Sequence, residues 1–466
     1  MRVSRWLTVV CVAAALNGAA FIEYQRPDWT TQWSDQDGYQ RLGESLARTG
    51  KFTRFPDAPR FVPEVIRTPA YPLFVAAIYT IAGVRHGAVA AAQTLIFVLI
   101  CLLVFAITRP VAGDATAVGA AALTALFPPI PYFAALVMTE VWTTFLFTIG
   151  VWLTLRGWRD GSSRTFAALG LVLAATALSR PAFVLYPFAL IAVAALVRLA
   201  VSREVPGVGR WTAMLATFAI ALTPWLTYNY VNLGRVTLSP AGGVGRGLWE
   251  GSWQATWSGR VQNELTHLAD DIEDRGALDA QVRAVAAREH VDPGPMLDYV
   301  HQWEDIREIW TTPTDPVERA AARVAADQEY GRVAMANLRR DSLAHLGARL
   351  ARGVFVLWAG DIPIRYSDIN RTPPIVIRFF WAVQAVLAAA AVAGLVVLAR
   401  GGRSVEALLL AAPIVYITAV HFPLLTEARQ SLPAKPVVLL LAAIAVAHAV
   451  HRSLAGKAQV HERQHL

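Results

Sequence analysis

Long apolar segments alternate with short charged loops along most of the chain, and two long hydrophilic stretches interrupt this pattern. A helix that crosses a bilayer needs about 20 apolar residues, because the hydrocarbon core is about 30 Å thick. The expected fold class is therefore an all-α integral membrane protein. About ten transmembrane helices are predicted, at residues 6–22, 86–108, 113–128, 135–156, 165–179, 183–199, 211–230, 375–399, 405–421 and 435–451.

Residues 70–84 form a shorter apolar stretch, which we expect to be an interfacial helix at the membrane surface. A helix of about 15 residues is about 22 Å long, which is less than the thickness of the hydrocarbon core. Counting it as a span would also reverse every later loop and place the arginine-rich 156–164 loop outside. The length of this stretch and the distribution of charge therefore agree.

Positive charges indicate on which side of the membrane each loop lies. Arginine is concentrated in alternate loops, including 156–164, 198–210 and 400–403, and such loops normally stay in the cytoplasm. With ten spans, both termini are then cytoplasmic. The Arg- and Ala-rich composition is typical of a bacterium with a GC-rich genome. We therefore expect a multi-pass protein of the bacterial inner (plasma) membrane with its active site on the extracytoplasmic side.

Two hydrophilic stretches fall on the extracytoplasmic side, at residues 23–85 and 231–374. In the first, Tyr39, Leu42 and Leu46 have the spacing of one face of an amphipathic helix. The second is charged yet periodic over much of its length, so we expect helices there rather than disorder. The chain divides into an N-terminal transmembrane module at 1–230, an extracytoplasmic loop or lid at 231–374, and a C-terminal transmembrane module with a short cytoplasmic tail at 375–466.

Composition argues against several other classes of protein. Hydrophobic residues make up 55% of the 466 residues and charged residues 16%, with a mean hydropathy of +0.41. The net charge is +8, but no run rich in Lys or Arg is present, so a nucleic-acid partner is not expected. Cys11 and Cys101 lie within apolar segments, and the ten histidines lack metal-binding spacing. Neither a disulfide framework nor a Cys- or His-based metal site is predicted.

The first extracytoplasmic loop contains two acids close to the membrane surface, Asp35 and Asp37. A carboxylate at that depth can take the proton from an attacking hydroxyl, as a general base does. The same residues would equally suit a solvated loop that caps the helix beginning near Gly38. Both aspartates are therefore candidate catalytic residues, and the pattern alone leaves the capping interpretation open.

Three arginines and one glutamate on the same side of the membrane are further candidates. Arg67 could bind a phosphate through its guanidinium group, or could only anchor the chain at the interface. Arg180 and Arg429 lie in short extracytoplasmic loops, against the usual charge bias, which suggests that they face an anion. Glu140 lies just inside the membrane, where a charge is costly unless paired. We predict donor-phosphate binding by the arginines and a catalytic role for Glu140, with plain salt bridges as the alternative.

Trp249, Trp253 and Trp257 repeat every four residues, so a helix would present all three on one side. Indole rings stack on sugars, but they also form the aromatic belt at the level of the lipid headgroups. Trp249 and Trp253 are therefore candidate substrate-binding residues, with the aromatic belt as the alternative.

In chain order, these residues belong to a longer series of motifs. The series comprises Asp35-Gln-Asp-Gly-Tyr39, Arg67-Thr-Pro-Ala-Tyr-Pro72, Thr139-Glu140, Ser179-Arg-Pro181, Pro224-Trp225 with Asn229 and Gly234, Gly242-Gly243 with Gly251, and Arg429 with Leu432-Pro433 and Pro436. It resembles the bacterial C-type glycosyltransferase superfamily, in particular the branch of protein O-mannosyltransferase-like and lipid A aminoarabinose transferase-like enzymes. The resemblance covers 1–255 and 375–455 and is thin over 260–370.

The resemblance implies an inverting membrane glycosyltransferase that transfers a sugar from a polyprenyl-phosphate donor to an extracytoplasmic glycan, lipid or protein. It maps the general base to Asp35, because the family usually places that aspartate four residues before the tyrosine. It also implies substrate contacts by Tyr39, Tyr71 and Asn229. The loop between the third and fourth spans has no Asp, so Glu140 would replace the additional carboxylate of relatives. No cofactor is predicted, and a divalent metal is left open.

Two other classes of function remain as alternatives. A polyprenyl-lipid or solute transporter could use the same arginines to escort a phosphate headgroup. Transporters often contain internal repeats and charged residues near the middle of the membrane, whereas the candidate charges here gather at one face. The third possibility is a catalytically silent assembly scaffold, against which the presence of Asp35 argues.

Overall fold

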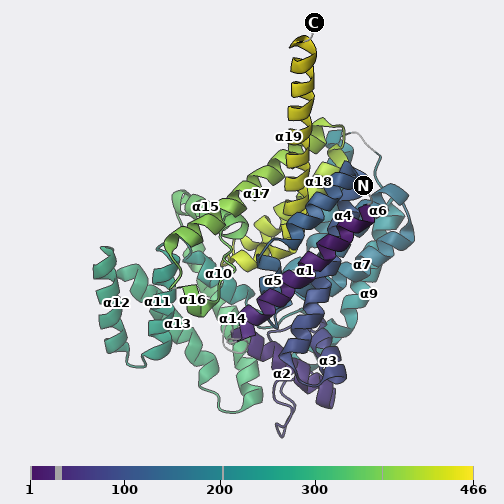
Figure 1. Ribbon diagram of the computed structural model, residues 1–466. Helices are drawn as coiled ribbons and strands as arrows, with labels where there is room; N and C mark the ends of the chain where they lie inside the picture. The colour runs from purple at the N-terminus through teal and green to yellow at the C-terminus, as the bar shows by residue number, and fades with distance from the viewer. Residues whose placement is uncertain (1–2, 27–33, 202–203, 370, 465–466) are drawn as a thin grey trace.

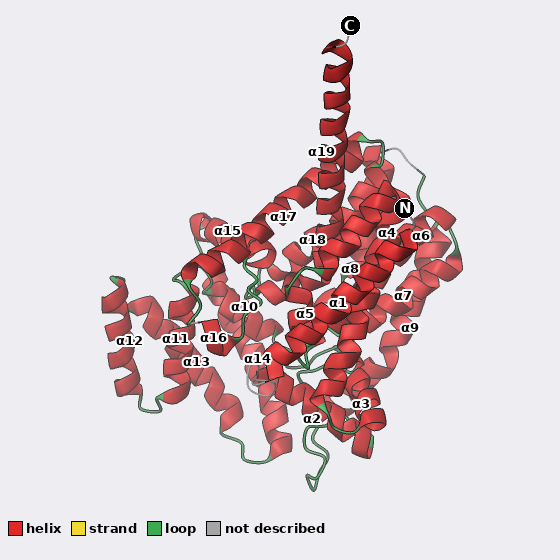
Figure 2. Cartoon of the chain, in the orientation of Figure 1, coloured by secondary structure: helices red, strands yellow, loops and turns green. Residues whose placement is uncertain are grey.

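The structure is a computed structural model that describes all residues except 1–2, 27–33, 202–203, 370 and 465–466. Within these described ranges the regular elements are helices, and Figure 2 shows no strand among them. The all-α class expected from the sequence is therefore confirmed.

The apolar segments form a bundle of long helices (Figure 1). Each predicted span coincides with one of them, and 86–108 and 113–128 lie in a single element that Gly113 interrupts with φ of 81°. The bundle helices are α1 (Val3–Gln25), α4 (His86–Ala125), α6 (Thr139–Asp160), α7 (Ser163–Ala177), α8 (Tyr186–Leu196), α9 (Val208–Leu233), α17 (Pro374–Arg400), α18 (Ser404–His421) and α19 (Lys435–Gln464). Short elements between them are α5 (Pro129–Ala134), the 3-10 helices η2 (Pro181–Phe183) and η4 (Ala428–Ala434), and the π-helix η3 (Val197–Val201).

Six segments of the described chain are long and apolar enough to cross a membrane. Helix α7 has only 15 residues, and α6 begins and ends with charged residues. The count of about ten spans therefore stays a prediction. The start of α1 and the far end of α19 lie at the same end of the bundle, opposite α2 and α3 (Figure 1). An even number of crossings would produce that arrangement.

Close helix packing in the bundle depends on small residues. Gly170 of α7 lies against α9, where an added Cβ would come within 2.2 Å of the Met214 carbonyl oxygen. Gly394 of α17 lies against α19 in the same way, 2.1 Å from the Leu441 carbonyl oxygen. Small residues at such crossings let two backbones approach closely, which is the usual way in which membrane helices associate.

The stretch between α1 and α4 contains α2 (Ser34–Thr49) and α3 (Ala70–Ala82). On α2, Leu42 is fully buried and Tyr39 and Leu46 pack against the core, so the amphipathic helix predicted from their spacing is confirmed. Helix α3 has 13 residues, which makes it about 20 Å long and shorter than a bilayer core. Its place at a membrane surface stays a prediction.

The segment 231–374 is helical over most of its length and lies to one side of the bundle (Figure 1). It has a hydrophobic core of its own, centred on the fully buried Trp249. Its helices are α10 (Val244–Ser252), α11 (Gly259–Asp271), α12 (Arg275–Glu289), α13 (Gly294–Thr311), α14 (Pro316–Arg339), α15 (Leu343–Ala359) and α16 (Tyr366–Ile369).

Candidate active site

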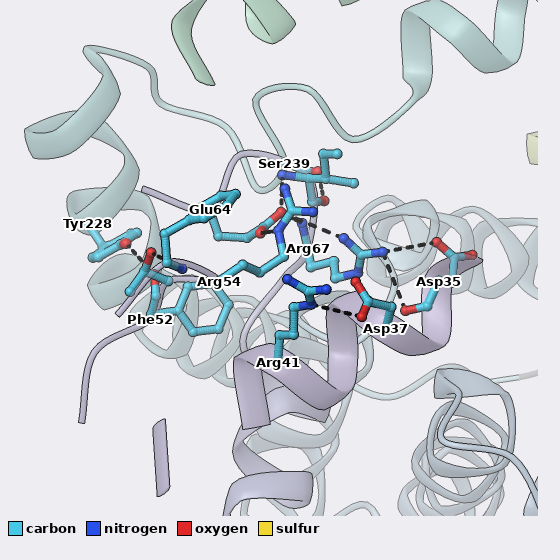
Figure 3. Close-up of polar contacts among 12 residues, drawn as sticks. Asp35, Asp37, Arg41, Phe52, Arg54, Glu64, Arg67, Tyr228 and Ser239 are labelled. Carbon is cyan, nitrogen blue, oxygen red and sulfur yellow. Dashed lines mark hydrogen bonds and ion pairs between the residues drawn. The ribbon is translucent and has the colours of Figure 1, made fainter. Parts of the chain in front are cut away.

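The two aspartates of the first motif point in different directions. Both lie in the first turn of α2, where the helix dipole favours negative charge. Asp35 faces Arg67, whereas Asp37 pairs with Arg41 at 2.8 Å on the exposed side of the helix (Figure 3). Residues two apart do not share a helix face, which explains the separation. Only Asp35 therefore joins the charged cluster described below.

Gly38 and Tyr39 of the same motif contact the Arg67 side chain. An added Cβ at Gly38 would lie 2.1 Å from the Arg67 Cζ, so only glycine leaves room for the guanidinium group there. On another side, the Arg67 Cζ lies 5.0 Å from the centre of the Tyr39 ring, in a cation–π contact. The backbone nitrogen of Arg67 donates a hydrogen bond to the buried Glu64 carboxylate at 3.2 Å. The side chain is consequently fixed and only 8% exposed.

Asp35 is held between two arginines from distant parts of the chain. Its Oδ1 accepts from Arg67 Nη2 at 3.3 Å, and its Oδ2 accepts from Arg429 Nη1 at 3.2 Å. Arg429 lies in η4, which a capping box between Glu427 and Gln430 stabilises. The Arg429 Nε also donates to Glu427 at 3.0 Å. A single carboxylate of α2 thus connects the stretch between α1 and α4 to η4.

Glu140 extends this network into the bundle. It lies in the first turn of α6, is fully buried, and accepts from Arg180 Nη2 at 2.6 Å. The Arg429 Nη1 is 3.5 Å from the same Glu140 oxygen, so it contacts both acids. A buried carboxylate needs such partners, because an unpaired charge would be very costly there. The predicted salt bridge is present, and it forms part of a continuous chain of alternating charges from Arg67 to Arg180.

The arginines set the protonation state of Asp35. Burial alone would raise its pKa, but the positive charges of Arg429 and Arg67 outweigh that effect and hold the pKa below its ordinary value. Burial and the nearby Asp35 charge raise the pKa of Tyr39 to about 12. At neutral pH the site therefore contains an ionised Asp35 beside a neutral phenol. Asp35 is also the accessible acid, with 39% of its side chain exposed against none for Glu140.

Some buried polar atoms of the cluster make no hydrogen bond within the described part of the chain. The buried Arg67 Nε and Nη1 and the buried Glu140 Oε2 have no hydrogen-bond partner among the described residues. The described parts of the chain also contain no group of three His, Cys, Asp or Glu residues suited to a metal ion. Because arginines lie against the oxygens of Asp35 and Glu140, a divalent cation would meet positive charge there. The donor set fits an anionic ligand better than a metal ion.

Two predicted substrate-binding residues have supporting contacts instead. Tyr71 is fully buried, packs edge-on against Tyr39 at 5.1 Å, and donates its hydroxyl hydrogen to Gln93 at 3.0 Å. It therefore holds the ring that Arg67 contacts. Asn229 donates from Nδ2 to the Thr237 carbonyl oxygen at 2.7 Å, which stabilises the turn after α9. Neither residue lies in the charged cluster.

The tryptophans also lie outside the cluster. Trp249 stacks on Tyr299 at 4.9 Å and donates from Nε1 to Gln302 at 2.7 Å, within the core of the segment 231–374. Trp253 stacks on Trp257 at 5.7 Å. Trp249 is inaccessible to a sugar and also to the lipid headgroups, because it is fully buried. The helix expected to present all three tryptophans is not formed, because α10 ends at Ser252, and the core explains Trp249 better than a sugar-stacking or an interfacial role.

Two acids of the site were not singled out from the sequence as functional residues. Glu64 is fully buried, accepts from Arg54 Nε at 2.6 Å, and binds the backbone before Arg67 (Figure 3). The signal was an isolated acid among apolar residues, three positions before a motif arginine. Glu427 lies two residues before Arg429 and pairs with it, as described above. Both acids position arginines.

Comparison with known proteins places this geometry in a wider context. Residues 66–228, about a third of the chain, match the sequence profile of the family described as dolichyl-phosphate-mannose-protein mannosyltransferase. No curated protein matches the sequence significantly.

Solved structures match over nearly the whole chain. The archaeal oligosaccharyltransferase AglB from Archaeoglobus fulgidus, in complex with an inhibitory peptide and a dolichol-phosphate, is 14% identical with a TM-score of 0.54. That match covers 97% of this chain and 52% of AglB. A second structure of the A. fulgidus enzyme, tethered to an acceptor peptide, gives a TM-score of 0.53 at 14% identity, with 96% of this chain and 50% of that chain covered. ArnT from Cupriavidus metallidurans in the apo state matches with a TM-score of 0.40 at 13% identity, over 94% and 78% of the two chains.

The chain has the fold of the C-type glycosyltransferases. The resemblance inferred from the motifs is therefore confirmed. The chain spans about half the length of the AglB enzyme that it matches.

Proposed function

We propose that this protein transfers a sugar from a polyprenyl-phosphate-linked donor to a hydroxyl group of an extracytoplasmic acceptor. The observation that carries the proposal is the placement of Asp35 between Arg67 and Arg429. Such a site offers both a base and the cations that a phosphate leaving group requires. The dolichol-phosphate bound to AglB and the name of the matched family support a lipid phosphate as the donor.

Asp35 is the proposed general base. It takes the proton from the acceptor hydroxyl as that oxygen attacks the anomeric carbon. The bond from this carbon to the phosphate oxygen then breaks, and the phosphate leaves with the electron pair. Because attack occurs opposite the leaving group, the configuration is inverted. A phosphate monoester is already a weak base, so no general acid is needed.

The arginines have a second role in this scheme. In the free enzyme both oxygens of Asp35 are paired with guanidinium groups, which makes the carboxylate a weak base. A donor phosphate that draws on Arg67 and Arg429 would weaken these pairs and thereby raise the basicity of Asp35. The Arg67 Nε and Nη1 make no hydrogen bond among the described residues, and they are the proposed donors to the phosphate oxygens. Donor binding would thus activate the base.

Glu140 has a positioning role in this proposal. Its Oε1 holds Arg180 and Arg429, and its full burial keeps it from reaching an acceptor in solvent. Loss of its charge would release both cations. Its role is therefore to fix the arginines rather than to move a proton.

The test uses the purified protein in lipid nanodiscs, supplied with polyprenyl-phosphate sugars and candidate acceptors. Mass spectrometry should detect consumption of the lipid-linked donor by the wild type and none by Asp35→Asn. UDP- and GDP-linked sugars should remain intact. Turnover of a nucleotide sugar would overturn the assignment of the donor. Lipid mass spectrometry of a deletion strain would identify the sugar from the donor that accumulates.

The proposed topology has its own test. A cysteine replacing Asp37, whose side chain is 57% exposed, should react in intact cells with a thiol reagent that cannot cross the inner membrane. Gln36 is a poor position for this probe because its side chain is fully buried. Labelling that requires a broken inner membrane would contradict the extracytoplasmic location.

A further inference from the structure

The loop formed by residues 422–427 leads from α18 directly to Arg429, and the extracytoplasmic segment holds its backbone. The Leu425 nitrogen donates to the Gly247 carbonyl oxygen at 2.7 Å. The Thr426 nitrogen donates to Gln254 Oε1 at 3.3 Å, and Arg349 Nη2 donates to the Pro423 carbonyl oxygen at 3.3 Å. The loop is therefore clamped between α10 and α15.

The packing at this clamp is tight on one side. An added Cβ at Gly251 would lie 2.5 Å from the Leu424 carbonyl carbon and 2.7 Å from the Pro423 carbonyl oxygen. At Gly247, one helical turn earlier, the nearest atom would be a Leu424 methyl carbon at 3.6 Å, which is an ordinary contact. Gln254 and Arg349 are 3% and 2% exposed, so their polar groups are committed to this region.

The loop transmits its position to the catalytic cluster through η4. Gln430 donates from Nε2 to the Leu425 carbonyl oxygen at 3.1 Å, and it also completes the capping box with Glu427. These bonds join the loop and η4 into one rigid unit. A displacement of the clamp would consequently move Arg429 relative to Asp35.

We propose that Gly251, Gln254 and Arg349 are positioning residues that hold Arg429 against Asp35. The extracytoplasmic segment then helps to position a residue of the active site, and does not only cover the site. This inference rests on the proposed glycosyl transfer, because it assigns Arg429 to the same site.

A displaced Arg429 has a signature that a general loss of structure does not have. The charged groups that face Asp35 are Arg67 before α3, Arg429 in η4 and, at longer range, Arg180, with Glu140 beyond them. Withdrawing Arg429 removes a positive charge and a hydrogen bond from Asp35. Its pKa would rise, and the acid limb of the activity profile would move to higher pH.

The test compares two alanine substitutions in the same helix. Gly251→Ala should lower kcat about tenfold or more, as expected for a displaced charge-assisted contact, and should shift the acid limb upward. Gly247→Ala should leave kcat and the limb within about twofold of the wild type, because its Cβ has room. Equal behaviour of the two variants would overturn the proposal.

A second pair of variants separates positioning from folding. Gln254→Met removes the acceptor for the Thr426 nitrogen and should reproduce the Gly251→Ala profile, whereas Gln254→Glu keeps an acceptor oxygen and should recover most of kcat. If Gly251→Ala and Gln254→Met lose activity with an unshifted acid limb and a lowered unfolding temperature, the residues are merely structural and the proposal fails. Full activity in Asp35→Asn would instead overturn the proposed function itself.

Discussion

The two hydrophilic regions of this protein, at residues 23–85 and 231–374, both contain residues predicted to bind a sugar donor, but they use them differently. In the stretch 23–85, Asp35 pairs with Arg67 of the same stretch and with Arg429, which lies far along the chain. In the segment 231–374, Trp249 packs against Tyr299 within the hydrophobic core of that segment. Charged side chains at the edge of an apolar bundle need partners of opposite sign. A row of aromatic side chains, in contrast, can be buried in any hydrophobic core. Convergence of charges was therefore the more informative signal.

The largest effect should come from the acid that joins both arginines. Asp35→Asn keeps the side-chain volume but removes the base, so we expect turnover to fall on the order of 10²- to 10⁴-fold. Asp37→Asn is the matched control, because its partner is the exposed Arg41, and it should stay within about twofold. Donor consumption by both variants in nanodiscs measures this. A larger loss for Asp37→Asn would show that the wrong aspartate has been assigned.

The second region should respond through stability. Trp249→Ala removes a fully buried ring, and we expect the free energy of unfolding to fall by about 3–5 kcal/mol. Trp249→Phe should cost less, because it keeps the stacking on Tyr299 while losing the hydrogen bond to Gln302. Thermal unfolding and limited proteolysis of the segment measure the change. If Trp249→Ala had normal stability but no turnover, Trp249 would have to be assigned to the substrate site.

Arg67 should show an intermediate effect on rate. Arg67→Gln removes a charge beside the proposed phosphate, and such a contact is worth about 1.5–3 kcal/mol, or tenfold and more in kcat/KM. Arg67→Lys should recover only part of the activity. The planar guanidinium of arginine can donate to Asp35 and to a phosphate at the same time, whereas the compact ammonium group of lysine cannot. Steady-state kinetics with the lipid-linked donor test this. Activity within about twofold for the glutamine variant would make Arg67 a structural anchor.

Much of the fold followed from hydrophobic periodicity, because a bilayer imposes long apolar helices. The segments 113–128 and 165–179 are largely helical, as predicted, although Gly113 interrupts one element and the other is short, and their crossing of a membrane stays a prediction. The amphipathic α2 was also predicted, from Tyr39, Leu42 and Leu46. The periodicity of 231–374 indicated helices but could not reveal their packing, which depends on contacts between residues far apart in sequence.

The site was predictable to a similar degree. Asp35, Arg67, Glu140, Arg180 and Arg429 were all singled out, and the structure brings all five together. Their pairing could not be derived from the sequence, since it depends on where η4 meets α2 and α6. The separation of Asp37 from Asp35 was the exception, because helix geometry alone would have predicted it. The requirement for glycine at position 38 became visible only with Arg67 in place.

The smallest expected effect is a shift in the pH dependence of activity. This effect concerns Asp35 alone, so it distinguishes the charged cluster from the core around Trp249. The proposed base acts when ionised, so activity should be present above its pKa and lost as the pH falls through it. In the free enzyme, Arg429 and Arg67 hold that pKa below its ordinary value, so the acid limb of kcat/KM should lie below the usual range of an aspartate, with kcat/KM flat from about pH 5 to 8. Arg67→Gln should move the limb upward, whereas Trp249→Phe should leave it in place. The measurement is kcat/KM against pH, with thermal unfolding recorded at each pH to exclude acid denaturation. A limb that stays fixed in Arg67→Gln would mean that Asp35 is not the titrating group.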